Sequence, residues 1–280
     1  MIINAANLGN LYVGFKTAFK TAFEGVQPMY EKVATTVTST TRSENYAWMG
    51  QFPRLREWIG DRQVKNLASF TYTITNKDWE ATVAVPRNDI EDDSYGIFTP
   101  LMSEMGLSAR THPDELVFTL LAAGFASPCY DGQYFFDTDH PVGDGTVSNM
   151  QSGAGSPWFL LDTSRSLKPI IFQERKKAKF EALTSDTDPN VFHRKEYIYG
   201  VDSRYNVGYG FWQMAFGSKA TLDQANFDAA IAAMMSFKND EGRPLGVKPT
   251  LLVVGPALRD KANAVVLSQK LANGADNPNY

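Results

Sequence analysis

The sequence predicts a mixed fold of the α+β class, and three patterns along the chain support this prediction. Apolar residues recur at steps of three and four from Leu8 to Val26, which is typical of an amphipathic helix. Apolar and polar residues alternate from Phe70 to Val85, which is typical of β-strands. In the last quarter, a capped helical pattern, the apolar run TLLVVG and a second helical pattern follow one another, as in an α+β or α/β unit.

Composition limits the classes of protein that fit. With 280 residues, 43% of them hydrophobic, the chain can form one large domain or two ordinary ones around a sizeable core. Its formal charge of -4 gives no overall basic field for nucleic acid or an anionic membrane. A single cysteine, Cys129, excludes an intrachain disulfide and a thiolate zinc cluster, and we expect it to be an inert small side chain. The sequence has neither a signal-peptide pattern nor a membrane-length apolar run, so we expect a soluble protein.

The amphipathic helix is expected to end near Gly25 and Pro28, and the threonine-rich run TTVTSTTRSE after it predicts an extended arm or an edge strand. The segment WMGQFPRLREWIGDRQV mixes large aromatic and charged residues without a period, so we favour a contact surface there over a locally packed turn. The alternation around Asn76-Lys77-Asp78 predicts a β-hairpin over residues 70–85.

A long helical pattern begins with a cap at residues 92–94 and is interrupted at Pro113, which predicts one kinked helix or two in succession. Residues 127–156 are rich in Gly, Pro, Asp and Ser and predict a long irregular loop. Strands are expected around residues 170–172 and, separated by Gly and Asn, over residues 193–216. Thr221 and Gln224 form a capping-box pattern that opens a helix, and Pro256 opens the helix after TLLVVG.

The run FDTDHPVGDG at residues 136–145 is the strongest candidate for chemistry. Asp137, Asp139 and His140 are ligand types that a metal-dependent hydrolase uses, but all three lie on one loop without the spacing that a helix or strand supplies. The run also lacks the glycine and the glutamate of a calcium loop. We therefore expect these residues to fix the shape of the loop, with the hydrolase as the alternative, and we expect no bound metal or cofactor.

Other catalytic patterns are weak. The sequence has no G-x-S-x-G and no phosphate-binding G-x-x-x-x-G-K-[ST] motif, and Gln213 replaces the third glycine of a dinucleotide loop. Aromatic and basic residues over 194–212 could stack on single-stranded nucleic acid, but we favour sheet packing, for which strands commonly carry aromatic residues. The residues alone favour a structural subunit over an enzyme, and an adhesin-like binding module is a third hypothesis.

Four segments carry a resemblance to a known family. They are FTYTITNKDWEATVAVPRNDIEDDSYGIF at 70–98, HPDELVFTLLAAG at 112–124, FFDTDHP at 135–141 and GRPLGVKPTLLVVGPAL at 242–258. In these runs and in their order the chain resembles the Mu-like phage major head subunits, a branch of the Hong Kong 97-type capsid proteins. The resemblance implies a major capsid protein that forms hexamers and pentamers of an icosahedral head around double-stranded DNA, and that is not an enzyme.

The resemblance also implies four parts. These are an N-terminal arm (1–45), an extended loop with a β-hairpin (46–88), a peripheral domain (89–220) with a spine helix over about 92–125, and an axial domain (221–280). The chain stops at NGADNPNY, where the family continues with further strands, which leaves open an axial domain that is incomplete at its C-terminal end.

Subunit contacts are expected in the aromatic and charged segment. Trp48, Phe52 and Trp58 are the expected apolar residues of the contact, and Arg54, Arg56, Arg62 and Lys65 are expected to meet acidic groups of the next subunit. The resemblance further implies a portal, a scaffold and a head-maturation protease as partners, packaged DNA bound without sequence specificity, and no membrane. The protein is expected in the virion shell after synthesis in the bacterial host cytoplasm.

Overall fold

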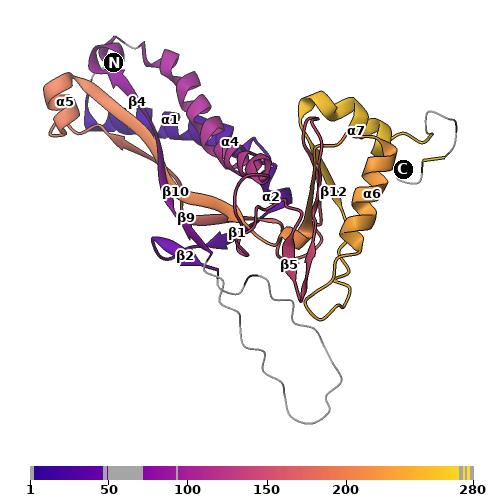
Figure 1. Ribbon diagram of the computed structural model, residues 1–280. Helices are drawn as coiled ribbons and strands as arrows, with labels where there is room; N and C mark the ends of the chain where they lie inside the picture. Colours follow the sequence, from indigo (N-terminus) through magenta and orange to yellow (C-terminus); the bar gives the residue numbers. More distant parts are fainter. Residues whose placement is uncertain are drawn as a thin grey trace.

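The computed structural model describes residues 3–46, 49, 72–92, 94–270, 274 and 276–277. Two four-stranded sheets divide these residues into two lobes, a long-sheet lobe and a short-sheet lobe, which lie side by side in Figure 1. Helices accompany the sheet in each lobe, so the α+β class expected from the sequence is confirmed.

The long sheet has the order β1-β9-β10-β4. Its strands are β1 (Ala34–Thr38), β9 (Ile170–Leu183), β10 (Glu196–Tyr209) and β4 (Lys77–Pro86). β1 runs parallel to β9 at one edge, which confirms the edge strand expected from the threonine-rich run. β10 is one continuous strand through Gly200 and Asn206, so the prediction of several strands separated by Gly and Asn was wrong here. Its inward-facing residues, such as Tyr197 and Tyr199, are buried and hold it in register.

Helices pack against one face of the long sheet. They are α1 (Ala5–Glu24), α2 (Tyr30–Val33), α3 (Arg87–Glu91), the 3₁₀ helix η1 (Ser94–Phe98), α4 (Thr99–Ala123) and, at the far tip, α5 (Pro189–Arg194). α4 continues through Pro113, so the interrupted pattern forms one helix, which begins at Thr99 and not near residue 92. α1 crosses α4 at Gly106, where a Cβ atom would lie 2.3 Å from the backbone oxygen of Phe19. Only glycine permits this close approach of the two helices.

The predicted hairpin over residues 70–85 was wrong in its pairing. β3 (Thr73–Thr75) pairs antiparallel with β2 (Ser43–Asn45), whereas β4 pairs antiparallel with β10. Asn76, expected in a turn, is buried between β3 and β4 and bonds to other parts of the chain. Both strands exist, but alternation reports only that one face is buried and does not identify the partner strand.

The short sheet has the order β12-β8-β11-β7. Its strands are β12 (Leu251–Val254), β8 (Trp158–Leu161), β11 (Ala215–Ser218) and β7 (Met150–Gln151), accompanied by α6 (Gln224–Met235), η3 (Pro256–Leu258) and α7 (Arg259–Val266). The N-cap of α6 is Asp223, whose side chain accepts from the Asn226 amide at 2.9 Å, and not Thr221 as the capping-box pattern predicted. Asp223 is an equally good capping residue placed one position before the helix.

Two hydrophobic clusters stabilise the lobes. The smaller lies between α1, α4 and the outer part of the long sheet, where Phe15 packs edge to face on Tyr199 with ring centroids 5.0 Å apart. The larger runs from the inner ends of β1 and β9 through residues 125–136 into the short sheet and α6. Because the larger cluster includes buried residues of both lobes, the lobes share one core at their junction.

Candidate subunit-assembly site

Residues 136–145 form an ordered element at the junction of the lobes. β5 (His140–Val142) and β6 (Gly145–Val147) make a small antiparallel hairpin, and Gly143 between them has a positive φ of 57°. A left-handed backbone at this position suits glycine, which is the local reason for the tight turn. The prediction of a wholly irregular loop over 127–156 was therefore wrong for this stretch.

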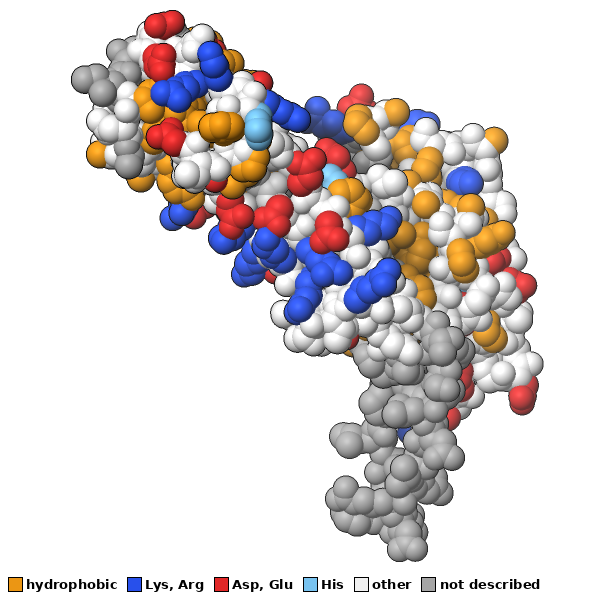
Figure 2. Space-filling model, turned by 90° about the vertical axis from the view of Figure 1, so that its left-hand side faces the viewer, with side chains coloured by type: hydrophobic (Ala, Val, Ile, Leu, Met, Phe, Trp, Pro, Cys, Tyr) orange, Lys and Arg blue, Asp and Glu red, His pale blue; other side chains and the backbone are white. Residues whose placement is uncertain are grey.

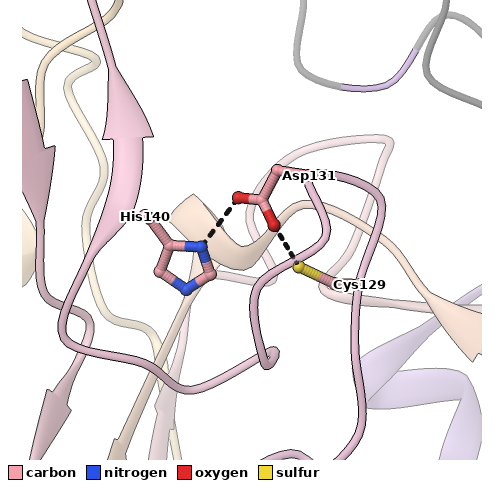
Figure 3. A group of neighbouring side chains, drawn as sticks. All are labelled: Cys129, Asp131 and His140. Carbon is pink, nitrogen blue, oxygen red and sulfur yellow. Dashed lines mark hydrogen bonds and ion pairs between the residues drawn. The ribbon is translucent and has the colours of Figure 1, made fainter. Parts of the chain in front are cut away.

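His140 is completely buried, and its partners come from elsewhere in the chain (Figure 3). Its Nδ1 lies 2.8 Å from Oδ2 of Asp131, and its ring stacks on Trp212 with centroids 4.0 Å apart and planes 11° apart. Cys129 completes the group, because its Sγ–H donates to Oδ1 of Asp131 at 3.0 Å. We call Cys129, Asp131, His140 and Trp212 the junction cluster.

The junction cluster is the place where the described residues come nearest to a metal site. Ligand atoms of Cys129, Asp131 and His140 lie within 4.8 Å of one another. Burial raises the pKa of the Cys129 thiol strongly, which disfavours the thiolate that a metal requires. Both oxygens of the Asp131 carboxylate already accept hydrogen bonds from its two neighbours. The geometry therefore supports a structural role, in which these hydrogen bonds hold the loop after α4 against β5.

The two carboxylates chosen from the sequence do not join His140. Asp137 accepts from the backbone amides of Tyr134 at 3.1 Å and Thr138 at 2.7 Å, as expected for a turn, and Asp139 is exposed. Sequence reasoning missed Asp131 and Trp212, which lie 9 positions before and 72 positions after His140 (140 − 131 and 212 − 140). The C-x-D spacing at 129–131 was the available signal, but adjacency along the chain drew attention to Asp137 and Asp139 instead.

The residues proposed for subunit contact lie outside the described residues. They are Trp48, Phe52, Arg54, Arg56, Trp58, Arg62 and Lys65. The described structure does show where the chain leaves for that segment and where it returns, because β2 ends at Asn45 and β3 begins at Thr73. The two ends are held together by β2–β3 pairing and by a 2.8 Å bond from the Tyr46 amide to the Tyr72 carbonyl.

The surface offers further places for contact. A groove of about 1080 Å³ lies between α1 and the strands β4, β9 and β10, with Tyr12, Phe23 and Leu183 among its apolar lining and Lys16 and Lys20 beside them. Figure 2 shows Lys and Arg side chains gathered together with Asp and Glu on one face. Charges of both signs also pair on the sheet, as between Arg204 and Asp78 at 3.3 Å. Such a surface suits contacts between copies better than a uniformly basic one would.

Among the helices of the described ranges, none is both long enough and apolar enough to cross a lipid bilayer. Many apolar residues of α1 and α4 are buried, but Val13 of α1 and Leu101 and Leu107 of α4 are exposed.

Comparisons with known proteins give one consistent result. The family model described as Mu-like prophage major head subunit gpT matches residues 8–280. The Mu-like prophage FluMu major head subunit of Haemophilus influenzae is 48% identical over 268 residues, covering 91% of this chain and 87% of the relative. The major capsid protein of Escherichia phage Mu is 42% identical over 285 residues, covering 98% of this chain and 93% of the relative.

Solved structures agree with the sequence relatives. The subunit in the procapsid of bacteriophage JBD30 superposes with a TM-score of 0.87 at 53% identity, covering 99% of this chain and 96% of that subunit. The subunit of the bacteriophage JBD30 capsid gives a TM-score of 0.80 at 40% identity, covering 100% of this chain and 96% of that one. The Hong Kong 97-type capsid fold expected from the sequence is therefore confirmed.

Proposed function

Because this chain belongs to the family of Mu-like prophage major head subunits, we propose that its copies assemble through hexamers and pentamers into an icosahedral head that encloses double-stranded DNA. The chain is a major capsid protein, and its homologues are structural proteins, so the alternative of a metal-dependent hydrolase is not supported. The match to a procapsid subunit over 99% of this chain carries the proposal, because the fold of the whole subunit is retained.

The four parts expected from the sequence remain part of this proposal. The long-sheet lobe supports a peripheral role and the short-sheet lobe an axial role, with residues 46–88 as the extended loop. A two-stranded antiparallel pair is marginal in isolation, so a loop based on β2 and β3 gains stability when it packs on a neighbouring copy. Contacts of this kind build the interfaces of about 2,000 Å² or more that permanent assemblies use.

The partners follow from the same role. We infer that a portal, a scaffold and a head-maturation protease act with this subunit during assembly in the bacterial host cytoplasm. The packaged DNA would be enclosed without sequence-specific contacts. The formal charge of -4 supports this view, because a strongly basic wall would bind the DNA instead of only containing it.

Electron microscopy of the expressed protein tests the proposal. We expect closed particles built of hexamers and pentamers, obtained with the scaffold and protease of the same phage where the chain needs them. A small soluble oligomer under those conditions would contradict the proposal.

Deletion of residues 54–66 tests the subunit-contact residues separately. We expect loss of particles while the thermal unfolding of the subunit changes little, because the variant retains β2, β3 and the described residues of the two core clusters. The matched control replaces the same residues by a Gly/Ser linker of equal length. Normal heads from the linker variant would show that the aromatic and basic side chains are not the contact.

A further inference from the structure

A buried amide joins the two strands at the base of the extended loop to the long sheet. Gln173 of β9 is completely buried, and its Nε2 donates to the carbonyl of Ile74 at 3.0 Å and to Oδ1 of Asn76 at 2.8 Å. Its Oε1 accepts from the hydroxyl of Tyr46 at 2.8 Å. One side chain therefore holds both the outgoing chain, at Tyr46, and the returning chain, at Ile74 and Asn76.

Asn76 extends this arrangement to the segment before β2. Its Nδ2 donates to Oγ of Ser39 at 2.8 Å and to the carbonyl of Thr41 at 3.0 Å. Ser39 and Thr41 in turn donate to Oε1 of Glu44, at 2.9 and 3.0 Å. We call Ser39, Thr41, Glu44, Tyr46, Asn76 and Gln173 the loop-base network.

An apolar contact and a backbone contact act at the same place. Ile74 of β3 lies directly over Gly208 of β10, where a Cβ atom would be only 2.3 Å from Cδ1 of Ile74. The Tyr209 amide donates to the hydroxyl of Tyr72 at 2.7 Å, and the Asn76 amide donates to the carbonyl of Arg42 at 3.0 Å. Glycine at position 208 lets β3 approach the sheet closely enough for these bonds to form.

The hydrogen bonds of Gln173 indicate that this residue fixes the orientation of its partners and does not only add stability. An apolar side chain could fill the space of Gln173, whereas its amide fixes three partners at defined angles. Burial raises the pKa of Tyr46 to about 12, so its hydroxyl keeps the proton that it donates. Buried polar groups with all partners in place hold one arrangement and disfavour the alternatives.

We propose that Gln173 and Asn76 are positioning residues for assembly, which set the direction in which the chain departs at Tyr46 and returns at Tyr72. The inference rests on the proposed role of the extended loop in subunit contact. A pair of three-residue strands cannot fix that direction alone, since so short a hairpin is marginal without further packing.

The first experiment compares two buried glutamines. Gln173→Leu removes the amide at the loop base, and Gln213→Leu is the matched control, because buried Gln213 bonds to the hydroxyl of Tyr130 at 2.9 and 3.1 Å outside the loop-base network. We expect hydrogen exchange at residues 43–45 and 73–75 to accelerate about tenfold or more in Gln173→Leu alone, since the Ile74 carbonyl and Oδ1 of Asn76 lose the hydrogen bonds that Gln173 donates. We also expect its particle yield to fall at least about tenfold below that of the control.

The second experiment uses a pair of substitutions that keep side-chain shape, in case Gln173→Leu does not fold. Tyr46→Phe removes one hydroxyl from the loop-base network, and Tyr130→Phe removes the equivalent hydroxyl from the Gln213 pair. We expect a reduced particle yield and faster exchange in β2 and β3 for Tyr46→Phe only.

The outcomes separate this inference from the proposed function. Faster exchange in β2 and β3 with unchanged particle yield would overturn the positioning role, and so would equal losses of particles in both members of either pair. If the unmodified chain forms no particles, the proposed function fails, while unchanged exchange in the Gln173 and Tyr46 variants would separately refute the anchoring of the base.

Discussion

The loop-base network and the junction cluster each fix a chain connection to the core, but they do so with different chemistry. In the first, the buried groups are neutral amides and hydroxyls, and the one carboxylate, Glu44, lies toward the surface. In the second, the carboxylate of Asp131 is buried against the imidazole of His140. Hydrogen bonds between neutral amides and hydroxyls fix the direction of the chain, and each contributes only modestly to the free energy of unfolding. A buried carboxylate is different, because removing its hydrogen-bond partner leaves a charge buried without compensation.

The difference in chemistry matches the difference in task. The junction cluster lies where both lobes share the larger hydrophobic cluster, so its loss should affect the whole subunit. The loop-base network lies where a segment leaves the sheet. Its loss should therefore change the direction of that segment more than it changes the stability of the fold. Three predictions test this contrast, in addition to the assembly experiments above.

The largest effect is expected for His140→Ala. The substitution removes the stack on Trp212 and leaves the Asp131 carboxylate buried without its main partner, which we expect to cost about 3–5 kcal/mol of unfolding free energy. Thermal or denaturant unfolding measures the loss, and elemental analysis before and after the substitution should show no change in bound metal. A stability equal to the unmodified protein, or a metal lost with the histidine, would contradict the structural role of the junction cluster.

A smaller effect is expected when equivalent asparagines are removed from the two regions. Asn149, near the junction cluster, donates to the carbonyls of Phe135, Trp212 and Ala215, at 2.8, 3.4 and 3.3 Å. We expect Asn149→Ala and Asn76→Ala each to cost about 1–3 kcal/mol, with the larger cost at Asn149 because it is completely buried and serves more carbonyls. Denaturant unfolding checks the order. If Asn76→Ala lowered the free energy of unfolding more than Asn149→Ala does, the expected difference between the two regions would be contradicted.

The smallest effect is expected from acid and Glu44. Hydrogen bonds from the Thr40 amide, Ser39 and Thr41 hold the pKa of Glu44 below its ordinary value of 4.5. Its stabilising effect is therefore present above pH 4.5 and is lost as the pH falls through the lower value in the folded protein. We expect Glu44→Gln to open β2 and β3 slightly at pH 7, with a difference from the unmodified protein that shrinks as the pH is lowered below 4.5, as measured by hydrogen exchange. A difference that grows on acidification would be the wrong sign.

The junction cluster responds to acid through Asp131. Burial alone would raise the pKa of Asp131, but hydrogen bonds from His140 and Cys129 outweigh it and hold the pKa below 3.8. By the same reasoning this contribution is lost only as the pH falls below 3.8.

Local patterns in the sequence predicted elements well and partners poorly. Helical periodicity located α1, and the Pro256 signal located the turn that leads into α7, because both depend on nearby residues. Strand partners depend on residues far apart in the chain, so alternation over 70–85 could not show that β3 pairs with β2 and β4 with β10.

The candidate site followed the same division. The sequence predicted a structural role for the loop that holds His140, and Asp137 in that loop bonds to nearby amides. Asp131 was not predicted as the partner of His140, since only folding brings it close, and the importance of Gln173 was hidden in an apolar strand. Polar residues within apolar strands and loops were the available signal, but the periodicity of apolar residues does not identify which of them are buried.

The pairing of β9 with β10 has a mechanical consequence. Each strand has 14 residues, and together they reach from the shared core at the junction to α5 at the tip. At 3.3 Å per residue such a ribbon is roughly 45 Å long, so a rotation of about 5° at its base would move the tip by about 4 Å. The register of the two strands shifts between Asp202 and Arg204 and again between Arg204 and Tyr205, and the ribbon would bend first at these irregularities.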